Sequence, residues 1–290
     1  MTAKTIYLIG GTTEASRAAQ TLEREGYRVV VSVATPLGES VAAAAALRTD
    51  TGRKDATVMA ERASGLGACA IVDCSHPFAR EVSRQAKKAA AAAGLPYLRY
   101  TRPPSDAAKA GNAASTAGPA VHTASETAVI AVESFEAAAS ELKNAGSRGL
   151  LTLGTRHLEP FVLAETDFTA RVLPFPESIS DCSRLGIEPA RIIAAWPPFD
   201  VDFNRACLRY AGAAMLVTKD SGREGGVGQK IAAAAAEGAA VILVNRPADP
   251  GAIYDLDGLL AALAAALDTP ASGAASPQSP AAEAPAPGSS

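Results

Sequence analysis

Short apolar runs alternate with helix-like segments over the first third of the chain. The first run ends at Gly10-Gly11 and leads into an Ala-rich stretch that Thr12 or Thr13 can cap. The run RVVVSV at Arg28–Val33 is continuous and β-branched, which is typical of a strand buried on both faces of a parallel sheet. These patterns predict strands at 5–9, 28–33, 70–74 and 97–100, and helices at 12–25 and from 77 to about 93. We expect an α/β domain here.

The same alternation returns later in the chain. It predicts strands at 127–132, 149–153, 169–173, 191–194, 215–218 and 241–244, and helices at 135–144, 202–210, 226–236 and 257–267. Residues 104–126 are rich in Ala, Gly, Ser and Pro and follow neither period, which predicts a flexible linker between domains 1–103 and 127–267. Residues 268–290 consist mostly of Ala, Pro, Ser and Gly, and this composition predicts a disordered tail.

Composition excludes several classes of protein. The 27 basic and 30 acidic residues give a formal net charge of −3, which argues against a nucleic-acid binder held by bulk positive charge. No apolar run is long enough for a transmembrane helix, and the N-terminus lacks the layout of a signal peptide, so we expect a cytoplasmic protein without a membrane partner. The 4 cysteines show no C-x-x-C spacing, which predicts neither a metal site nor a disulfide framework.

The glycine turn after the first strand is a candidate phosphate site. Backbone N–H groups at Gly10-Gly11-Thr12 would face a ligand at a helix N-terminus, where the helix dipole favours an anion. The turn departs from G-x-G-x-x-G, because Thr13 and Glu14 occupy positions where glycines would stand. The alternative is a tight strand–helix turn with a threonine cap and no ligand.

The end of the second strand bears on the choice of nucleotide. The residues Ser32 to Thr35 include no Asp or Glu that could bind a ribose 2′-hydroxyl, whereas their hydroxyls tolerate a 2′-phosphate. This favours NADPH over NADH. Arg53 or Lys54 would have to fold back to place a cation beside those hydroxyls.

Polar residues also follow two other predicted strands. Ser75 and His76 come directly after the strand at 70–74, where open α/β sheets place ligands, although His76 could simply satisfy a backbone group at a helix start. The segment 217–226, VTKDSGREGG, joins a strand to a helix and combines glycines with Lys219 and Arg223. It predicts a site for a polyanion, the alternative being a solvated charged loop.

These motifs together carry a resemblance. They are GGTTEA at 10–15, DCSHPFA at 73–79, YLRYTRP at 97–103, LLTLGTRHLEPF at 150–161, VTKDSGREGG at 217–226 with Lys230, and VNRP at 244–247. In this order and spacing the set resembles the precorrin-6A reductase family of cobalamin biosynthesis. The chain departs from the family pattern at Trp196–Phe199, where Gly-Pro-Phe is usual, and at Asp220, where Asn is common.

The resemblance implies two Rossmann-like domains with parallel sheets and a cleft between them. It implies that residues 1–103 bind a pyridine nucleotide, for which we expect NADPH with NADH as the alternative, and that residues 127–267 bind a tetrapyrrole, precorrin-6A. A hydride would pass to C19 and a proton to C18, giving a dihydro product. We expect a monomer or a small homo-oligomer.

The resemblance and the motif positions assign candidate site residues. The cofactor-binding set is Gly10, Gly11, Thr12, Thr13, Glu14, Ser32, Thr35 and Ser75. The substrate-binding set is Arg99, Arg156, Lys219, Ser221, Gly222, Arg223, Lys230 and Arg246, and Arg102 is a further cation within the motifs. The catalytic set is His76, Lys219 and Ser221, with a water as the alternative proton donor to His76.

Three other functions stay open. One is a cobalt-precorrin-6A reductase that uses NADH. Another is an enzyme of the short-chain dehydrogenase kind, but neither Tyr97 nor Tyr100 is followed by lysine at the spacing Tyr-x-x-x-Lys. The third is a non-catalytic nucleotide sensor, which would leave the segment 217–226 without a role.

Overall fold

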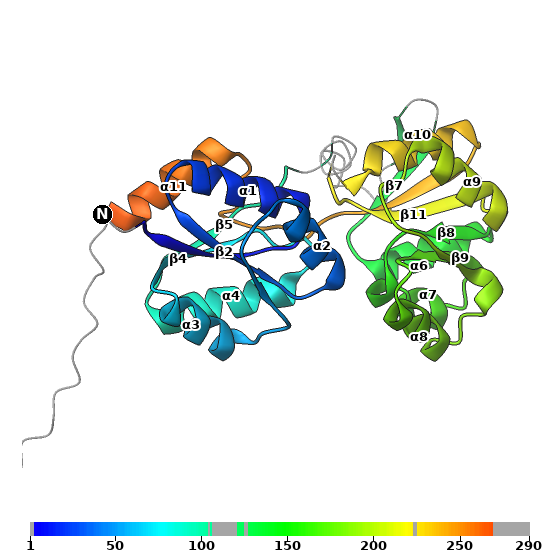
Figure 1. The fold of residues 1–290 in the computed structure, drawn as a ribbon. Helices are drawn as coiled ribbons and strands as arrows, with labels where there is room; N and C mark the ends of the chain where they lie inside the picture. Colours follow the sequence, from blue (N-terminus) through cyan, green and yellow to red (C-terminus); the bar gives the residue numbers. More distant parts are fainter. Residues whose placement is uncertain (1–2, 104, 106–120, 125–126, 223–224, 269–290) are drawn as a thin grey trace, which may run out of the picture.

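The computed structural model describes residues 3–103, 105, 121–124, 127–222 and 225–268, and it contains two sheets, each covered by helices (Figure 1). The first sheet is parallel and has the order β3-β2-β1-β4-β5. Its strands are β1 (Thr5–Ile9), β2 (Arg28–Val33), β3 (Thr49–Thr51), β4 (Ala68–Asp73) and β5 (Tyr97–Arg99). The chain moves outward in opposite directions from β1 and β4, so a crevice opens at their carboxyl ends.

Helices from the described part of the chain cover both faces of the first sheet. They are α1 (Thr13–Arg24), α2 (Pro36–Ala44), α3 (Ala56–Gly65), α4 (Arg80–Ala93) and α11 (Leu256–Asp268). One core joins α1, α2 and α11 to one face of the sheet, and a second core joins α3 and α4 to the other face. The two sets lie on opposite sides of the sheet in Figure 1.

The last helix belongs to the first sheet, which differs from the expectation that 127–267 forms one domain. Leu259 and Leu263 of α11 are buried in the same core as Leu22 of α1. The chain returns to this sheet before α11, where Ile253 donates a backbone hydrogen bond to Arg99 and accepts one from Thr101. This return places the apolar face of α11 against the first sheet. The second sheet already has helices on both of its faces.

The second sheet has the order β10-β9-β8-β11-β12-β7-β6. Its strands are β6 (Val121–Ala124), β7 (Thr127–Val132), β8 (Gly149–Leu151), β9 (Phe168–Val172), β10 (Ile192–Ala194), β11 (Met215–Lys219) and β12 (Ala240–Val244). All neighbours are parallel except β6 and β7, which pair antiparallel at one edge. A second crevice opens at the carboxyl ends of β8 and β11.

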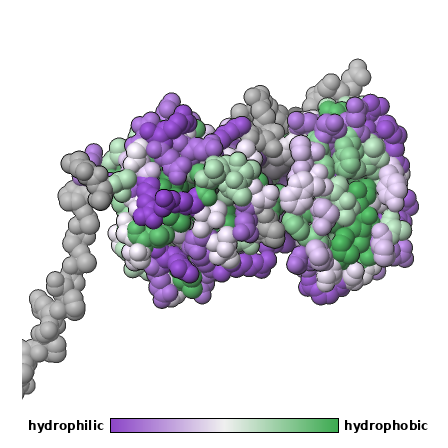
Figure 2. Space-filling view, in the orientation of Figure 1, coloured by the Kyte–Doolittle hydropathy of each residue, from purple (hydrophilic) through white to green (hydrophobic). Residues whose placement is uncertain are grey.

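Helices again cover both faces of this sheet. One face carries α6 (Phe135–Ala145), α7 (Glu159–Leu163) and α8 (Pro176–Arg184), and the other carries α9 (Val201–Ala211) and α10 (Val227–Ala236). Among the described residues, the short 3-10 helices η1 (Thr155–His157) and η2 (Pro189–Arg191) lie in the connections. In the space-filling view the halves form two lobes (Figure 2). No helix in the described part of the chain has the length and apolar character that a membrane span requires.

The predicted α/β architecture of two Rossmann-like halves is confirmed. Some boundaries differ: the helix expected from Pro77 begins at Arg80, because Ala79 N–H closes a turn on the carbonyl of His76. Of the predicted linker, 121–124 is the edge strand β6, and 104, 106–120 and 125–126 lie outside the described residues, as does the tail from 269. The four cysteines are unpaired in the described structure.

Candidate functional site

The crevice of the first sheet holds a cavity of about 610 Å³, called here the first cavity. Its lining comes from the ends of three neighbouring strands and from the loop after β3. Six of the predicted cofactor residues line it: Gly10, Gly11, Thr12, Ser32, Thr35 and Ser75. The structure therefore brings together residues that are far apart in the sequence, as the parallel order of β1, β2 and β4 requires.

The two glycines of the turn are needed for different reasons. A Cβ at Gly10 would lie 2.4 Å from the Cβ of Ala15, so a side chain there would push α1 away from β1. Gly11 has φ +147° and approaches the backbone of Gly38, whose Cα would be 3.1 Å from an added Cβ. Thr12 caps α1 by accepting a hydrogen bond from Ala15 N–H. The turn thus combines the predicted cap with close backbone packing.

Two predicted cofactor residues do not line the first cavity. Glu14 is buried and forms an ion pair with Arg102 at 3.0 Å, so its carboxylate holds the segment that leaves β5. Thr13 lines a second cavity, described below. The departure from G-x-G-x-x-G therefore has a structural cause, since the position of Glu14 is used for an ion pair.

Two cations from the loop after β3 line the first cavity beside Ser32 and Thr35. The ammonium of Lys54 donates hydrogen bonds to the carbonyls of the segment 50–52 at 2.9 to 3.1 Å and lies 3.3 Å from the Asp50 carboxylate. Arg53 is exposed and makes no ion pair with a described residue. Arg53 is therefore the cation that a bound anion can recruit, without the chain having to refold.

The second cavity lies between the two halves and has a volume of about 690 Å³. It is lined by Gly11, Thr12, Thr13, His76 and Arg102 from the first half, and by Leu153, Arg171, Lys219, Ser221 and Lys230 from the second. Gly11, Thr12 and His76 line both cavities. A ligand in one cavity can therefore contact a ligand in the other at this junction.

His76 is held as a neutral imidazole at the junction. Burial, together with the positive charges of Lys219 and Arg102, lowers the pKa of His76 well below its ordinary value. Its Nδ1 accepts a hydrogen bond from the backbone N–H of Phe78 at 3.2 Å. The proton of the neutral ring is thus assigned to Nε2, which can donate a hydrogen bond but is a weak acid.

Lys219 and Lys230 are buried cations in the second cavity. Burial lowers the pKa of Lys219 to about 8, with a further contribution from Arg156. Burial, Arg171 and Lys219 lower the pKa of Lys230 to about 7. Each ammonium donates to a backbone carbonyl, Lys219 to Leu153 and Lys230 to Gly225, and neither forms an ion pair with a described carboxylate. An anion bound here would stabilise their charged forms.

The glycine-rich segment after β11 packs against the first half. Ser221 lines the second cavity and donates its hydroxyl to the carbonyl of Gly225. Gly222 has φ +74°, and an added Cβ would lie 2.4 Å from Cδ of Arg102. Gly222 therefore permits a close contact between the halves, whereas Ser221 faces the cavity. Arg223 lies outside the described residues.

Three other predicted substrate residues lie elsewhere. Arg99, the last residue of β5, pairs with Asp73 at the end of β4 and with Asp249, and it does not line the second cavity. Arg246 pairs with Asp220, which is fully buried, at 2.9 Å. Arg156 is exposed on η1 and lines the first cavity.

Sequence reasoning missed Arg171 and Trp196, which both line the second cavity. Arg171 is the fourth of the five residues of β9, FTARV, and is 5% exposed. A charged residue within an otherwise apolar strand was the available signal. Trp196 is 46% exposed at the cavity wall, and its ring meets that of Phe175 edge-on.

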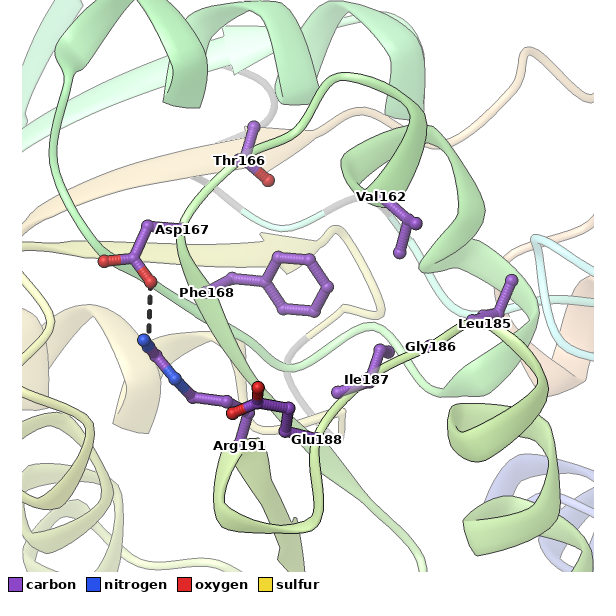
Figure 3. A pocket seen from close by; sticks show the side chains of 9 residues that line it. All are labelled: Val162, Thr166, Asp167, Phe168, Leu185, Gly186, Ile187, Glu188 and Arg191. Atoms are coloured by element: carbon purple, nitrogen blue, oxygen red, sulfur yellow. Dashed lines mark hydrogen bonds and ion pairs between the residues drawn. The ribbon is translucent and has the colours of Figure 1, made fainter.

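A smaller cavity of about 300 Å³ lies apart from these residues in the second half. Figure 3 shows its lining side chains, with Arg191 paired with Asp167 at 2.8 Å. None of the predicted site residues lines it.

Comparison with known proteins agrees with this arrangement. A family model described as precorrin-6x reductase CbiJ/CobK matches residues 5–264. A cobalt-precorrin-6A reductase of Priestia megaterium is 32% identical over 86% of this chain and 93% of its own length. A precorrin-6A reductase of Rhodobacter capsulatus is 30% identical over 84% of this chain and 89% of its own length.

A solved structure of a CobK precorrin-6A reductase has the same two-sheet architecture. It superposes with a TM-score of 0.66 at 27% identity, and the alignment covers 90% of this chain and 97% of that one. The chain therefore belongs to the precorrin-6x reductase CbiJ/CobK family and is an oxidoreductase that acts on a CH–CH group.

Proposed function

We propose that this protein is a precorrin-6A reductase that uses NADPH to reduce the C18–C19 double bond of its tetrapyrrole substrate. The observation that carries the proposal is the junction of the two cavities at Gly11, Thr12 and His76. A dinucleotide in the first cavity and a macrocycle in the second would meet there. The nicotinamide supplies the hydride, and the protein contributes binding, orientation and exclusion of water.

The first cavity fits a dinucleotide with a 2′-phosphate. Backbone N–H groups of the glycine turn at the start of α1 suit the pyrophosphate. Ser32 and Thr35 offer hydroxyls without a carboxylate at the end of β2, and Arg53 offers a guanidinium from the adjacent loop. This combination favours NADPH over NADH, because a phosphate gains a charge-assisted contact that a hydroxyl lacks.

The second cavity fits a substrate with several carboxylates. Lys219 and Lys230 supply charge, and Ser221 supplies a hydroxyl. Trp196 and Leu37 supply apolar surface from the two halves, which suits the body of a macrocycle.

Lys219 is the proton donor in this proposal. Its Nζ lies 5.5 Å from the centroid of the Phe78 ring, beside the segment that carries His76. A pKa of about 8 keeps Lys219 charged near neutral pH while making it a stronger acid than an ordinary lysine. His76 is neutral, so its role is to orient the reacting rings through its Nε2–H.

The short-chain dehydrogenase alternative receives no support from the two tyrosines. Tyr97 donates its hydroxyl to Asp73, Tyr100 is buried in the core of the first half, and neither lines either cavity.

An anaerobic assay with two nucleotides and two substrates tests the proposal. Precorrin-6A and its cobalt form are each added to enzyme with NADPH or with NADH, and the loss of nicotinamide absorbance is followed. We expect the highest kcat/KM with NADPH and precorrin-6A. Turnover of the cobalt form with NADH at a higher kcat/KM would assign the chain to the cobalt pathway, and nucleotide binding without turnover of either substrate would leave a nucleotide sensor.

A further inference from the structure

Arg171 is a buried arginine without an acidic partner in the described structure. Its side chain rises from β9, and the guanidinium donates from Nη1 to the Asn204 Oδ1 at 2.8 Å. The centre of the guanidinium lies 4.1 Å from the centroid of the Phe199 ring. These partners are neutral, so they orient the charge without neutralising it. A charge removed from water in this way is costly for the fold, and such groups are concentrated at binding sites.

The position of the guanidinium is fixed by its surroundings. Asn204 lies on α9 and donates from Nδ2 to the carbonyl of Asp200 at 2.6 Å, which settles the direction of its Oδ1. Phe199 stacks on Phe203 with the ring planes 15° apart. Among the described residues only Nη1 of Arg171 has hydrogen-bond partners. The Nε and Nη2 donors remain for a ligand.

Arg171 lines the second cavity together with Lys230, another buried cation. Arg171 contributes to lowering the pKa of Lys230, which shows that the two charges act on each other. An anion placed between them would be attracted by both and would relieve their repulsion. A planar carboxylate matches the two parallel donors of a guanidinium, which an ammonium cannot offer.

We propose that Arg171, oriented by Asn204 and Phe199, binds one carboxylate arm of the substrate and thereby fixes which edge of the macrocycle enters the second cavity. The inference rests on the proposed function, since it takes the carboxylated tetrapyrrole as the ligand. Arg171 is a specificity-determining residue here, and Asn204 is a positioning residue.

The test measures binding of precorrin-6A without reductant, followed by quenching of the fluorescence of Trp196, the chain's single tryptophan. Arg171→Met should weaken binding about ten- to a hundredfold, the loss of one charge-assisted contact. Arg171→Lys should restore binding only in part. The control Arg209→Met changes an exposed arginine that pairs with Glu237 outside both cavities, and it should bind as the wild type does. Affinity for NADPH, measured by calorimetry, should be the same in all four proteins.

Asn204→Asp keeps the test decisive if Arg171→Met fails to fold. The new carboxylate would pair with Arg171 inside the protein and compete with the ligand's carboxylate. The variant also loses the hydrogen bond from Asn204 Nδ2 to the carbonyl of Asp200, so we expect no gain in melting temperature but at least tenfold weaker binding of precorrin-6A. If Arg171 were only structural, Asn204→Asp would leave the binding of precorrin-6A unchanged.

The outcomes separate this inference from the proposed function. Wild-type enzyme that binds and reduces precorrin-6A, together with unchanged binding in Arg171→Met or Asn204→Asp, overturns the inference alone. Wild-type enzyme that neither binds nor reduces precorrin-6A overturns the proposed function, and the inference falls with it.

Discussion

Arg246 donates a hydrogen bond from Nη1 to the main-chain carbonyl of Arg102 at 2.6 Å, and so ties the end of β12 to the segment that leaves β5. The same guanidinium pairs through Nε with the buried carboxylate of Asp220. Asp220 in turn accepts a hydrogen bond from the backbone of Gly222. One arginine thus holds the glycine-rich segment of the second half against the first half, where the two cavities meet.

This arrangement predicts a structural role for Arg246. Arg246→Met would leave the Asp220 carboxylate buried without its partner, at a cost of about 3–5 kcal/mol. We expect a melting temperature lower by several degrees, measured by calorimetry, and partial recovery in Arg246→Met/Asp220→Asn. An unchanged melting temperature with a raised KM for the tetrapyrrole would instead return Arg246 to the substrate site.

From the close packing of the glycine turn we predict that a side chain at Gly11 weakens nucleotide binding. Gly11→Val places a branched side chain against Gly38 and into the first cavity, so NADPH should bind at least tenfold more weakly by calorimetry. Gly26→Ala is the matched control, because Gly26 also has positive φ but an added Cβ meets nothing within 4 Å. It lies outside the cavity and should leave the affinity unchanged. Equal losses in both variants would mean that backbone strain, not contact with the nucleotide, is responsible.

We predict that replacing Arg53 changes the preference of the enzyme for NADPH over NADH. Arg53→Gln removes the exposed guanidinium of the first cavity, which should raise the KM for NADPH about tenfold, since a charge-assisted contact is lost. The KM for NADH, which has no 2′-phosphate, should stay the same. Steady-state kinetics with both nucleotides measures this. A parallel rise for both would place Arg53 at a part of the nucleotide that they share.

The lowered pKa of Lys219 predicts how kcat/KM falls at high pH. Its ordinary pKa of 10.5 is lowered to about 8, so the active, charged form predominates below pH 8 and is lost above it. The kcat/KM for the tetrapyrrole should therefore fall about tenfold per pH unit above pH 8. Lys219→Arg keeps its charge at every accessible pH, so its lower activity should show no limb near 8. If the fall in kcat/KM above pH 8 persists in Lys219→Arg, a group other than Lys219 causes it.

The same shift has a consequence for stability. Between pH 8 and 10.5 the unfolded chain holds a proton on Lys219 that the folded protein has released, so the free energy of unfolding contributed by this group rises with pH across that window. Activity and stability should therefore change in opposite directions above pH 8.

The architecture was predictable where a physical constraint acts on neighbouring residues. Continuous runs such as Arg28–Val33 predicted buried parallel strands, and the glycine turn with its threonine cap predicted the start of α1. The helices α2 and α3 were missed, because their Ala-rich sequences carry weak amphipathic periodicity. The side of the molecule on which α11 packs depends on the return of the chain at Ile253, which no local pattern encodes.

The candidate site was predictable at strand ends but not within strands. Gly11, Ser75 and Lys219 follow from the rule that ligands lie at the carboxyl ends of parallel strands. Arg171 lies within β9, one residue before its carboxyl end, and Asn204 and Phe199, from another part of the chain, orient its guanidinium. Arg99 and Arg246 show the converse, since each stands in a motif yet pairs with buried carboxylates.

The most direct test of the account is whether hydride passes between the two cavities without exchanging with water. The enzyme is supplied anaerobically with precorrin-6A and NADPH that carries deuterium at the transferable position of the nicotinamide, and the product is examined by mass spectrometry and NMR. The account predicts one deuterium at C19 and a solvent-derived proton at C18. A product without deuterium, or with deuterium at C18 in place of C19, would contradict it.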